Sequence, residues 1–265
     1  MIPSTLVYPS AIFSILIFIF GLLWGSFFNV CIFRLPLEKS VIWGRSSCPK
    51  CHALIPWFCN IPVISFVLLR GRCRNCKASI SIQYPLIELI TGFLFFGLYS
   101  YYGLSKECLF ALVFCSILLV VSVIDLKHQI IPDEISLPGI IVGFLLSIWL
   151  GKISWMDSLL GTLLGGGSFL LVAWGYEKLA KREGLGGGDI KLLAMIGAWL
   201  GIQSLLIVII VSSLVGSLIG IGAMIICKKD FKAAIPFGPF LALGALAYLF
   251  WGNELTTVLF PPLVP

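Results

Sequence analysis

Charged residues are scarce in this chain. Only 11% of its 265 residues are Asp, Glu, Lys or Arg, whereas 59% are hydrophobic and the mean hydropathy is +1.07. A soluble domain carries about 25% charged residues, so this composition excludes a soluble globular protein. Its long apolar runs predict an all-α polytopic membrane protein embedded in a lipid bilayer. In such a protein the net charge of +6 reports orientation and predicts no nucleic-acid partner.

Histidine is scarcer still, with His52 and His128 as the only two. The sequence therefore has no HExxH metal site, and no Ser-His-Asp or Cys-His arrangement competes for a catalytic role. The glycine run at 184–188 lacks the Gly-Lys-Ser/Thr ending of a phosphate-binding loop, and it follows an apolar helix where such a loop follows a strand. These absences exclude zinc-peptidase and P-loop chemistry.

Eight apolar segments approach the roughly 20 residues that cross a bilayer as a helix. They lie near 10–33, 83–102, 107–126, 134–150, 156–177, 189–201, 203–227 and 236–252. We expect the first to be a retained span, because it is too long for a signal peptide and lacks a suitable cleavage site. The sixth is short and follows the glycine run, so we expect it inside a helix bundle or beside a water-filled cavity. The predicted domains are a first helix (1–33), a polar insert (34–82) and a helix bundle (83–265).

Basic residues predict the orientation of these spans. With eight spans, 16 of the 18 Lys and Arg residues lie on one side, and only Lys106 and Lys152 lie on the other. The basic loops are those near 34–82, 127–133, 178–188 and 228–235. By the positive-inside rule these loops are cytoplasmic, and the glycine run and the insert are cytoplasmic with them.

The insert contains two Cys-x-x-Cys knuckles, Cys48-Pro49-Lys50-Cys51 and Cys73-Arg74-Asn75-Cys76. Four thiolates with this spacing can bind a tetrahedral Zn²⁺ ion, which folds a small domain that has too little core to fold alone. Disulfides are disfavoured on a cytoplasmic face, where thiols stay reduced. We therefore predict a structural zinc site, with His52 and Cys59 left over. The other cysteines, in or beside spans, read as small apolar residues.

Acids on the apolar segments are few, so each one is a candidate functional group. Asp125 ends the third span and Asp189 begins the sixth, and the orientation places both at the cytoplasmic boundary. Two carboxylates that face each other do not easily both ionise, so the pKa of one rises, which suits a general base paired with a general acid. Asp133 is expected to cap the fourth span. Glu88 is either a buried polar partner or a site acid facing a cavity.

These residues together resemble one family. Gly186-Gly187-Gly188-Asp189 matches the GxGD signature of intramembrane aspartic peptidases, and the segment from Asp125 to Asp133 resembles that of type IV prepilin peptidases. Further similar stretches are Gly25-Ser26-Phe27-Phe28-Asn29-Val30, the two knuckles, and Tyr84-Pro85 with Glu88. They occur in order between about residues 25 and 200, which makes the match specific.

The resemblance implies a bifunctional enzyme of the bacterial inner membrane. It would cleave the basic leader from prepilins or pseudopilins after a glycine, on the cytoplasmic side, and then methylate the new N-terminus with S-adenosylmethionine. On this view Asp125 and Asp189 are the catalytic pair, and Cys48, Cys51, Cys73 and Cys76 bind zinc. Substrate-loop residues would be Gly186, Gly187, Gly188 and Lys191, whereas Asn29 and Glu88 are candidates for methyl transfer or substrate contact. Pilus, type II secretion and competence substrates all stay open.

Two other functions remain compatible with the residues alone. A polytopic transporter or channel could use Asp125 and Asp189 for coupling or permeation, although no second interrupted helix indicates an inverted repeat. A membrane-anchored zinc or redox sensor would place its activity in the insert and use the helices as an anchor. The substitutions Asp125→Asn and Asp189→Asn separate these possibilities, because either one should abolish leader cleavage if the protein is a peptidase.

Overall fold

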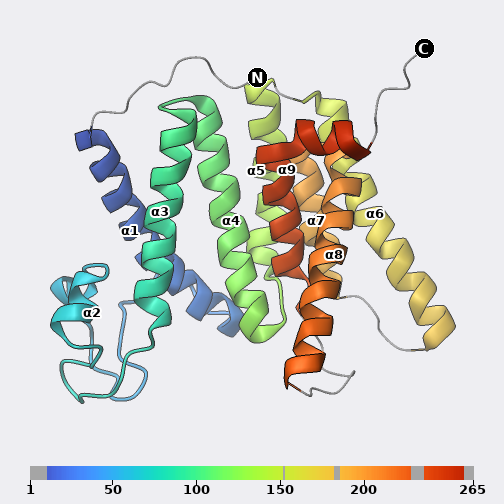
Figure 1. Ribbon diagram of the computed structural model, residues 1–265. Helices are drawn as coiled ribbons and strands as arrows, with labels where there is room; N and C mark the ends of the chain where they lie inside the picture. Colours follow the sequence, from blue (N-terminus) through green and yellow to red (C-terminus); the bar gives the residue numbers. More distant parts are fainter. Residues whose placement is uncertain (1–10, 152, 182–185, 228–235, 260–265) are drawn as a thin grey trace, which may run out of the picture. The chain divides into compact units, whose positions relative to one another are not determined.

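The computed structural model describes residues 11–151, 153–181, 186–227 and 236–259 (Figure 1). Some predicted features lie outside the described residues, namely Gly184 and Leu185 of the glycine run, Lys152 and the basic loop 228–235; the side chain of Cys227 is also outside them. The described residues form helices and no strand, with only two isolated antiparallel bridges, Ser47–Leu54 and Arg72–Ser79. The all-α prediction is confirmed.

A helix corresponds to each of the eight apolar segments. Their bounds are α1 Ala11–Arg34, α3 Gln83–Tyr102, α4 Lys106–His128, α5 Asp133–Leu150, α6 Trp155–Ala180, α7 Gly187–Leu200, α8 Ile202–Cys227 and α9 Gly238–Leu259. The last helix is kinked at Trp251, where φ is −126° and ψ is 21°. That kink lies one residue before the predicted end of the eighth segment.

Five of the helical segments are long and apolar enough to cross a membrane. They are Ala11–Leu37, Lys106–His128, Asp133–Leu150, Trp155–Ala180 and Ile202–Gly222. By length and composition, α3, α7 and α9 do not meet the same criterion. The prediction of a membrane protein is therefore confirmed, and the count of eight spans stays a prediction.

The chain divides into two compact units, residues 1–116 and 117–265. In the first unit α1 packs along α3 through glycines. A Cβ added to Gly21 would lie 2.8 Å from the Cα of Gly92, and one added to Gly25 would lie 2.6 Å from the Cα of Glu88. Close approach of two backbones at small residues is the usual way in which helices associate in lipid.

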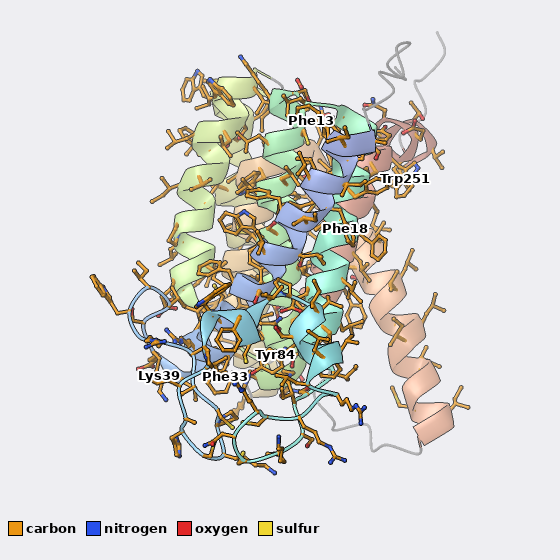
Figure 2. All side chains as sticks on the ribbon, turned by 90° about the vertical axis from the view of Figure 1, so that its left-hand side faces the viewer. Phe13, Phe18, Phe33, Lys39, Tyr84 and Trp251 are labelled. Carbon is orange, nitrogen blue, oxygen red and sulfur yellow. The ribbon has the colours of Figure 1, made fainter. Side chains whose placement is uncertain are left out.

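The polar insert leaves α1 at Arg34 and returns to α3 at Gln83. It contains two short 3-10 helices, η1 Leu35–Leu37 and η2 Trp57–Asn60, and the five-residue helix α2 Ile64–Leu68. Figure 2 shows Phe33, Lys39 and Tyr84 at the end of α1 and α3 where the insert is attached. The Arg34 guanidinium donates to the carbonyls of Ser40, Trp43, Gly44 and Arg45 at 2.9–3.3 Å. One side chain thus organises the first loop of the insert.

In the second unit α7 is the central helix. It packs against α5, α6, α8 and α9 (Figure 1), and every residue from Leu192 to Leu200 is buried. The expectation that this short helix lies inside a bundle is confirmed. Because the segment from Leu192 to Leu200 is apolar and enclosed, it anchors the more exposed first turn of α7 to the bundle.

Small and hydroxyl residues fix α7 against the helices beside it. Gly161 of α6 and Gly197 of α7 face each other so closely that a Cβ on either would clash with the carbonyl of the other. The hydroxyls of Ser147 and Ser158 both donate to the Ala198 carbonyl, at 2.9 and 2.7 Å. Gly161 is therefore required for close helix packing, whereas Gly167 faces open space.

Candidate functional site

The structure brings Asp125 and Asp189 together in the second unit. Asp125 lies in the last turn of α4 and is only 5% exposed, and Asp189 lies half-buried in the first turn of α7. Their two segments meet around Ile131, which lies against Gly188, the residue before Asp189, and against Gly238, whose N–H binds Asp125. Asp189 is not a capping residue, because the N-cap of α7 is Gly186 and no side-chain capping bond is present there.

Asp125 has a backbone partner that the sequence did not indicate. The N–H of Gly238, the first residue of α9, donates to Asp125 Oδ2 at 2.9 Å, in a buried position. A helix N-terminus presents free N–H groups and a positive dipole end, so this is a favourable place for a carboxylate oxygen. The bond fixes the orientation of Asp125 and leaves its other oxygen for a second partner.

Ile131 fills the space beside both carboxyl-bearing segments. A Cβ added to Gly188 would lie 2.9 Å from the Cβ of Ile131, and one added to Gly238 would lie 3.3 Å from its Cδ1. By contrast, a Cβ at Gly187 would meet nothing within 4 Å. The three glycines before Asp189 therefore differ, since Gly188 is in tight contact and Gly187 is open.

Lys191 and Asp133 form an ion pair that joins the first turn of α7 to the first turn of α5. Their Nζ–Oδ1 distance is 2.6 Å, and the side chains are 39% and 54% exposed. The prediction that Asp133 caps its helix is wrong, because α5 begins at Asp133 itself, its N-cap is Pro132, and no side-chain capping bond is present there. The carboxylate is engaged across the helices by Lys191. In this way the ion pair adds a polar link beside the Ile131 contact.

In the first unit the four knuckle cysteines form one cluster. The sulfur atoms of Cys48, Cys51, Cys73 and Cys76 all lie within 4.8 Å of one another, and those of Cys48 and Cys76 are 3.9 Å apart. Sulfurs at tetrahedral corners around Zn²⁺ with bonds of about 2.3 Å lie about 3.8 Å apart. The described cysteines are all free thiols. This donor set fits a zinc ion, and His52 and Cys59 do not belong to it.

The two knuckles repeat one backbone pattern. In each, the N–H of the first cysteine donates to the carbonyl five residues later, and its own carbonyl accepts from the N–H four residues later. The bonds are Cys48 to Ala53 at 3.0 Å, His52 to Cys48 at 2.9 Å, Cys73 to Ala78 at 2.8 Å and Lys77 to Cys73 at 3.0 Å. His52 and Lys77 have matching φ values of 56° and 58°. The insert is therefore built from two equivalent turns that face each other.

Backbone N–H groups prepare the thiols for metal binding. The N–H groups of Cys51 and Lys50 lower the pKa of Cys48, and those of Cys76 and Asn75 lower the pKa of Cys73. The Ala78 N–H lowers the pKa of Cys76 as well, but desolvation and the three neighbouring sulfurs outweigh it and raise that pKa to about 11. Four thiolates this close repel one another electrostatically, and a bound divalent cation would offset that repulsion.

Asn29 and Glu88 also lie in the first unit, where α1 and α3 meet. Glu88 is 7% exposed, and its Oε2 accepts the Val63 N–H at 2.7 Å. Asn29 is 4% exposed and its Nδ2 donates to the Tyr84 carbonyl at 3.0 Å. Its Oδ1 has no hydrogen-bond partner, and no other buried side-chain oxygen or nitrogen among the described residues shares that condition. Glu88 thus has a structural partner, whereas Asn29 keeps a free acceptor.

Two family models match the chain. The bacterial peptidase A24 N-terminal domain matches residues 19–102, and the type IV leader peptidase family matches residues 112–221. The first match contains the insert with its four cysteines, and the second contains Asp125 and Asp189. The first match lies within the first compact unit, residues 1–116, and the second begins five residues before the end of that unit and continues into the second.

Curated relatives carry the name prepilin leader peptidase/N-methyltransferase. A protein of that name from Aeromonas hydrophila is 37% identical over 265 residues, covering 91% of both chains. One from Stutzerimonas stutzeri is 37% identical and covers 90% of both. A relative from Myxococcus xanthus is 41% identical over 81% of this chain and 64% of its own length. No solved structure matches the chain.

Proposed function

The chain belongs to the type IV leader peptidase family, and from this membership we propose that it is a prepilin leader peptidase with N-methyltransferase activity. It removes the basic leader of type IV prepilins or pseudopilins after a glycine and then methylates the new N-terminus. We place it in the bacterial inner membrane with the Asp pair and the zinc insert on the cytoplasmic side, because basic residues concentrate in those loops. The observation that carries the proposal is the 37% identity to a prepilin leader peptidase/N-methyltransferase over 91% of both chains.

The proposed chemistry uses the two carboxyl groups as a unit. One carboxylate takes a proton from a water molecule, whose oxygen attacks the scissile carbonyl carbon, while the protonated partner donates a hydrogen bond to the carbonyl oxygen. When the tetrahedral intermediate collapses, the C–N bond breaks and a proton passes to the leaving amine. The shared proton belongs to the pair. The Gly238 N–H supports this role because it holds Asp125 in one orientation.

The glycine run supplies the approach for the substrate. Gly186 and Gly187 are exposed beside Asp189, and Gly187 has open space where a side chain would lie. An extended peptide can therefore lie close to the carboxyl pair. Cleavage requires this extended form, because a peptide bond within a helix is poorly exposed to attack. Glu134 is exposed in the first turn of α5 and offers negative charge to a basic leader, whereas the Asp133 carboxylate is paired with Lys191. Lys191 is assigned a structural role, because its ion pair with Asp133 fixes the first turn of α7 to the first turn of α5.

Zinc has a structural role in this proposal. Cys48, Cys51, Cys73 and Cys76 would bind it, since four sulfurs within 4.8 Å of one another form a suitable donor set. Bound zinc would fold the insert, which has few buried apolar residues of its own. No step of leader cleavage depends on it.

Methyl transfer is the second proposed activity. S-adenosylmethionine would supply a methyl group to the amine that cleavage creates. Asn29 stays a candidate for contact with that amine, because its buried Oδ1 is a free acceptor. Glu88 is better suited to a supporting role, since it already binds the Val63 N–H. The contacts of these two residues do not define a complete site for the methyl donor, so we derive no transfer step from them.

The transporter and sensor hypotheses find no support among the relatives. The deciding experiment is to co-express the protein with a prepilin and measure the mass of the product. We expect loss of the leader and the added mass of one methyl group. Asp125→Asn and Asp189→Asn should each abolish leader loss while leaving zinc content unchanged. Leader cleavage that survives both substitutions would remove the carboxyl pair from the mechanism.

A further inference from the structure

The insert carries a large surplus of positive charge. Between residues 34 and 82 it has eight Lys or Arg residues and a single acid, Glu38. A zinc ion with four thiolates contributes two negative charges, which leaves the insert strongly basic. A basic leader peptide is repelled by such a surface, which suits an anionic partner of another kind.

Four of these cations surround a hollow beside the second knuckle. The hollow has a volume of about 410 Å³ and is lined by Leu68, Leu69, Arg70, Arg72, Cys73, Arg74 and Lys77. Among the described residues, no acid forms an ion pair with any of the four lining cations. Unpaired guanidinium groups around a hollow favour a phosphate-type ligand, which they can bind with two parallel hydrogen bonds.

The backbone that presents these cations is ordered by its own hydrogen bonds. The Gly71 N–H donates to the Phe66 carbonyl at 2.8 Å, and the Lys77 N–H donates to the Cys73 carbonyl at 3.0 Å. The Arg74 guanidinium lies over the Phe58 ring, 5.1 Å from its centroid. The hollow is therefore a built feature of the second knuckle.

One hydrogen bond sets the depth of this region relative to α3. The Val63 N–H binds Glu88, which lies five residues after the start of α3 at Gln83. At a rise of 1.5 Å per residue this is about 8 Å along the helix axis. Helix α2 begins at the next residue, Ile64, so it lies beside the first turns of α3. On the proposed orientation this end of α3 is the cytoplasmic one, so α2 is placed at the cytoplasmic boundary of the membrane.

The side chains of α2 suit that boundary. Ile64, Val67 and Leu68 are 55%, 64% and 77% exposed, and nearby Trp57 is 80% exposed. Exposed apolar side chains on a short helix are unfavourable in water, but they gain free energy in contact with acyl chains. Tryptophan is enriched at the same membrane interface. Leu68, the last residue of α2, lines the hollow, and its first arginine, Arg70, follows two residues later.

We propose that the insert is a binding site for an anionic phospholipid of the membrane that holds the protein. The headgroup phosphate occupies the hollow formed by Arg70, Arg72, Arg74 and Lys77, and α2 lies among the first carbons of the acyl chains. The zinc site rigidifies the knuckle that carries these arginines. The lipid thereby fixes the insert against the leaflet.

Native mass spectrometry of the zinc-loaded protein in detergent tests this proposal. Phosphatidylglycerol, phosphatidylcholine and inorganic phosphate are added separately, and the bound fraction is measured for each. We expect the wild-type protein to retain phosphatidylglycerol about ten-fold better than phosphatidylcholine, because each basic residue near a headgroup adds to binding. The triple variant Arg70→Gln, Arg72→Gln, Arg74→Gln should lose that preference. Leu68→Gln should weaken lipid retention as well.

The matched control removes the same charge elsewhere in the insert. Lys39, Arg45 and Lys50 are exposed and do not line the hollow, so replacing all three with Gln should leave the lipid preference intact. An equal loss in both triple variants would assign the effect to bulk charge and overturn the site. Displacement of the lipid by inorganic phosphate, or no preference in the wild type, would overturn it too. Zinc content is measured throughout, and Arg70→Glu, farther from the knuckle cysteines, repeats the test if the triple variant loses zinc.

Discussion

Replacement of Gly188 by alanine should impair leader cleavage through a contact with one side chain. The new Cβ would lie 2.9 Å from Ile131 Cβ, 3.2 Å from its Cγ1 and 3.3 Å from its backbone nitrogen. Carbon atoms prefer to be at least about 3.5 Å apart, so one segment must move by about 0.6 Å. Ile131 cannot relieve the contact by rotation, because its Cβ and backbone nitrogen are themselves involved.

The movement therefore falls on the first turn of α7, and Asp189 is the next residue. A misplacement of about 1 Å can cost about 100-fold in rate, so we expect Gly188→Ala to lower kcat by about 10- to 100-fold. The assay is the initial rate of prepilin cleavage in detergent, measured at several substrate concentrations to separate kcat from KM. Thermal unfolding should show that the variant stays folded.

Gly187→Ala is the matched control. It makes the same chemical change one residue earlier in the same helical turn, so any gain in helix propensity, at most about 1 kcal/mol, is common to both variants. Nothing lies within 4 Å of its new Cβ, so we expect kcat to be unchanged; because Gly187 borders the proposed substrate approach, any effect should fall on KM. Equal losses in the two variants, or full activity in Gly188→Ala, would refute the assignment of this glycine to the geometry of the carboxyl pair.

Three further predictions concern the remaining contacts of the two sites. Gly238→Ala would place a Cβ 2.7 Å from Asp125 Oδ2 and should reduce kcat at least as strongly as Gly188→Ala does, with KM unchanged in the same assay. Reversing the charge of Lys191 or of Asp133 alone should lower the rate of cleavage, and reversing both should restore part of it. The pair is well exposed, so each change in rate should be only about two- to five-fold. A double variant no more active than the single variants would contradict the pairing. The knuckle thiols must lose their protons to bind zinc, and backbone N–H groups lower the pKa values of Cys48 and Cys73. Zinc content measured by atomic absorption should therefore be retained at neutral pH and fall on acidification or chelation. A zinc content that does not change with pH would contradict this thiolate site.

The sequence was most informative where long apolar runs determine the structure. Each of the eight predicted segments has a helix, and the ends agree within about three residues except for α9, which continues seven residues past the predicted end at 252; such runs have few alternatives in a bilayer. The pairing of Asp125 with Asp189 was also predictable, since both stand at the same end of apolar helices. The four cysteines came together as their spacing indicated.

The contacts that hold these groups in place were not predictable in the same way. Gly238 carries no side-chain signal, and its bond to Asp125 spans 113 positions in the chain. The Val63 N–H that binds Glu88 and the four carbonyls bound by Arg34 depend on how irregular loops return to helix ends. Asp133 was assigned to a cap by local rules, but tertiary structure offered it Lys191 as a closer partner. Backbone donors and loop paths leave no periodic pattern for a sequence to display.

The position of Ile131 has an evolutionary consequence. It is 8% exposed and occupies the space where side chains of residues 188 and 238 would otherwise lie. Three positions that are distant in sequence therefore share one fixed volume, and the effect of a substitution at any of them depends on the other two. We expect this epistasis to appear in natural sequences as correlated change, with a larger residue at 188 or 238 tolerated only where residue 131 is smaller.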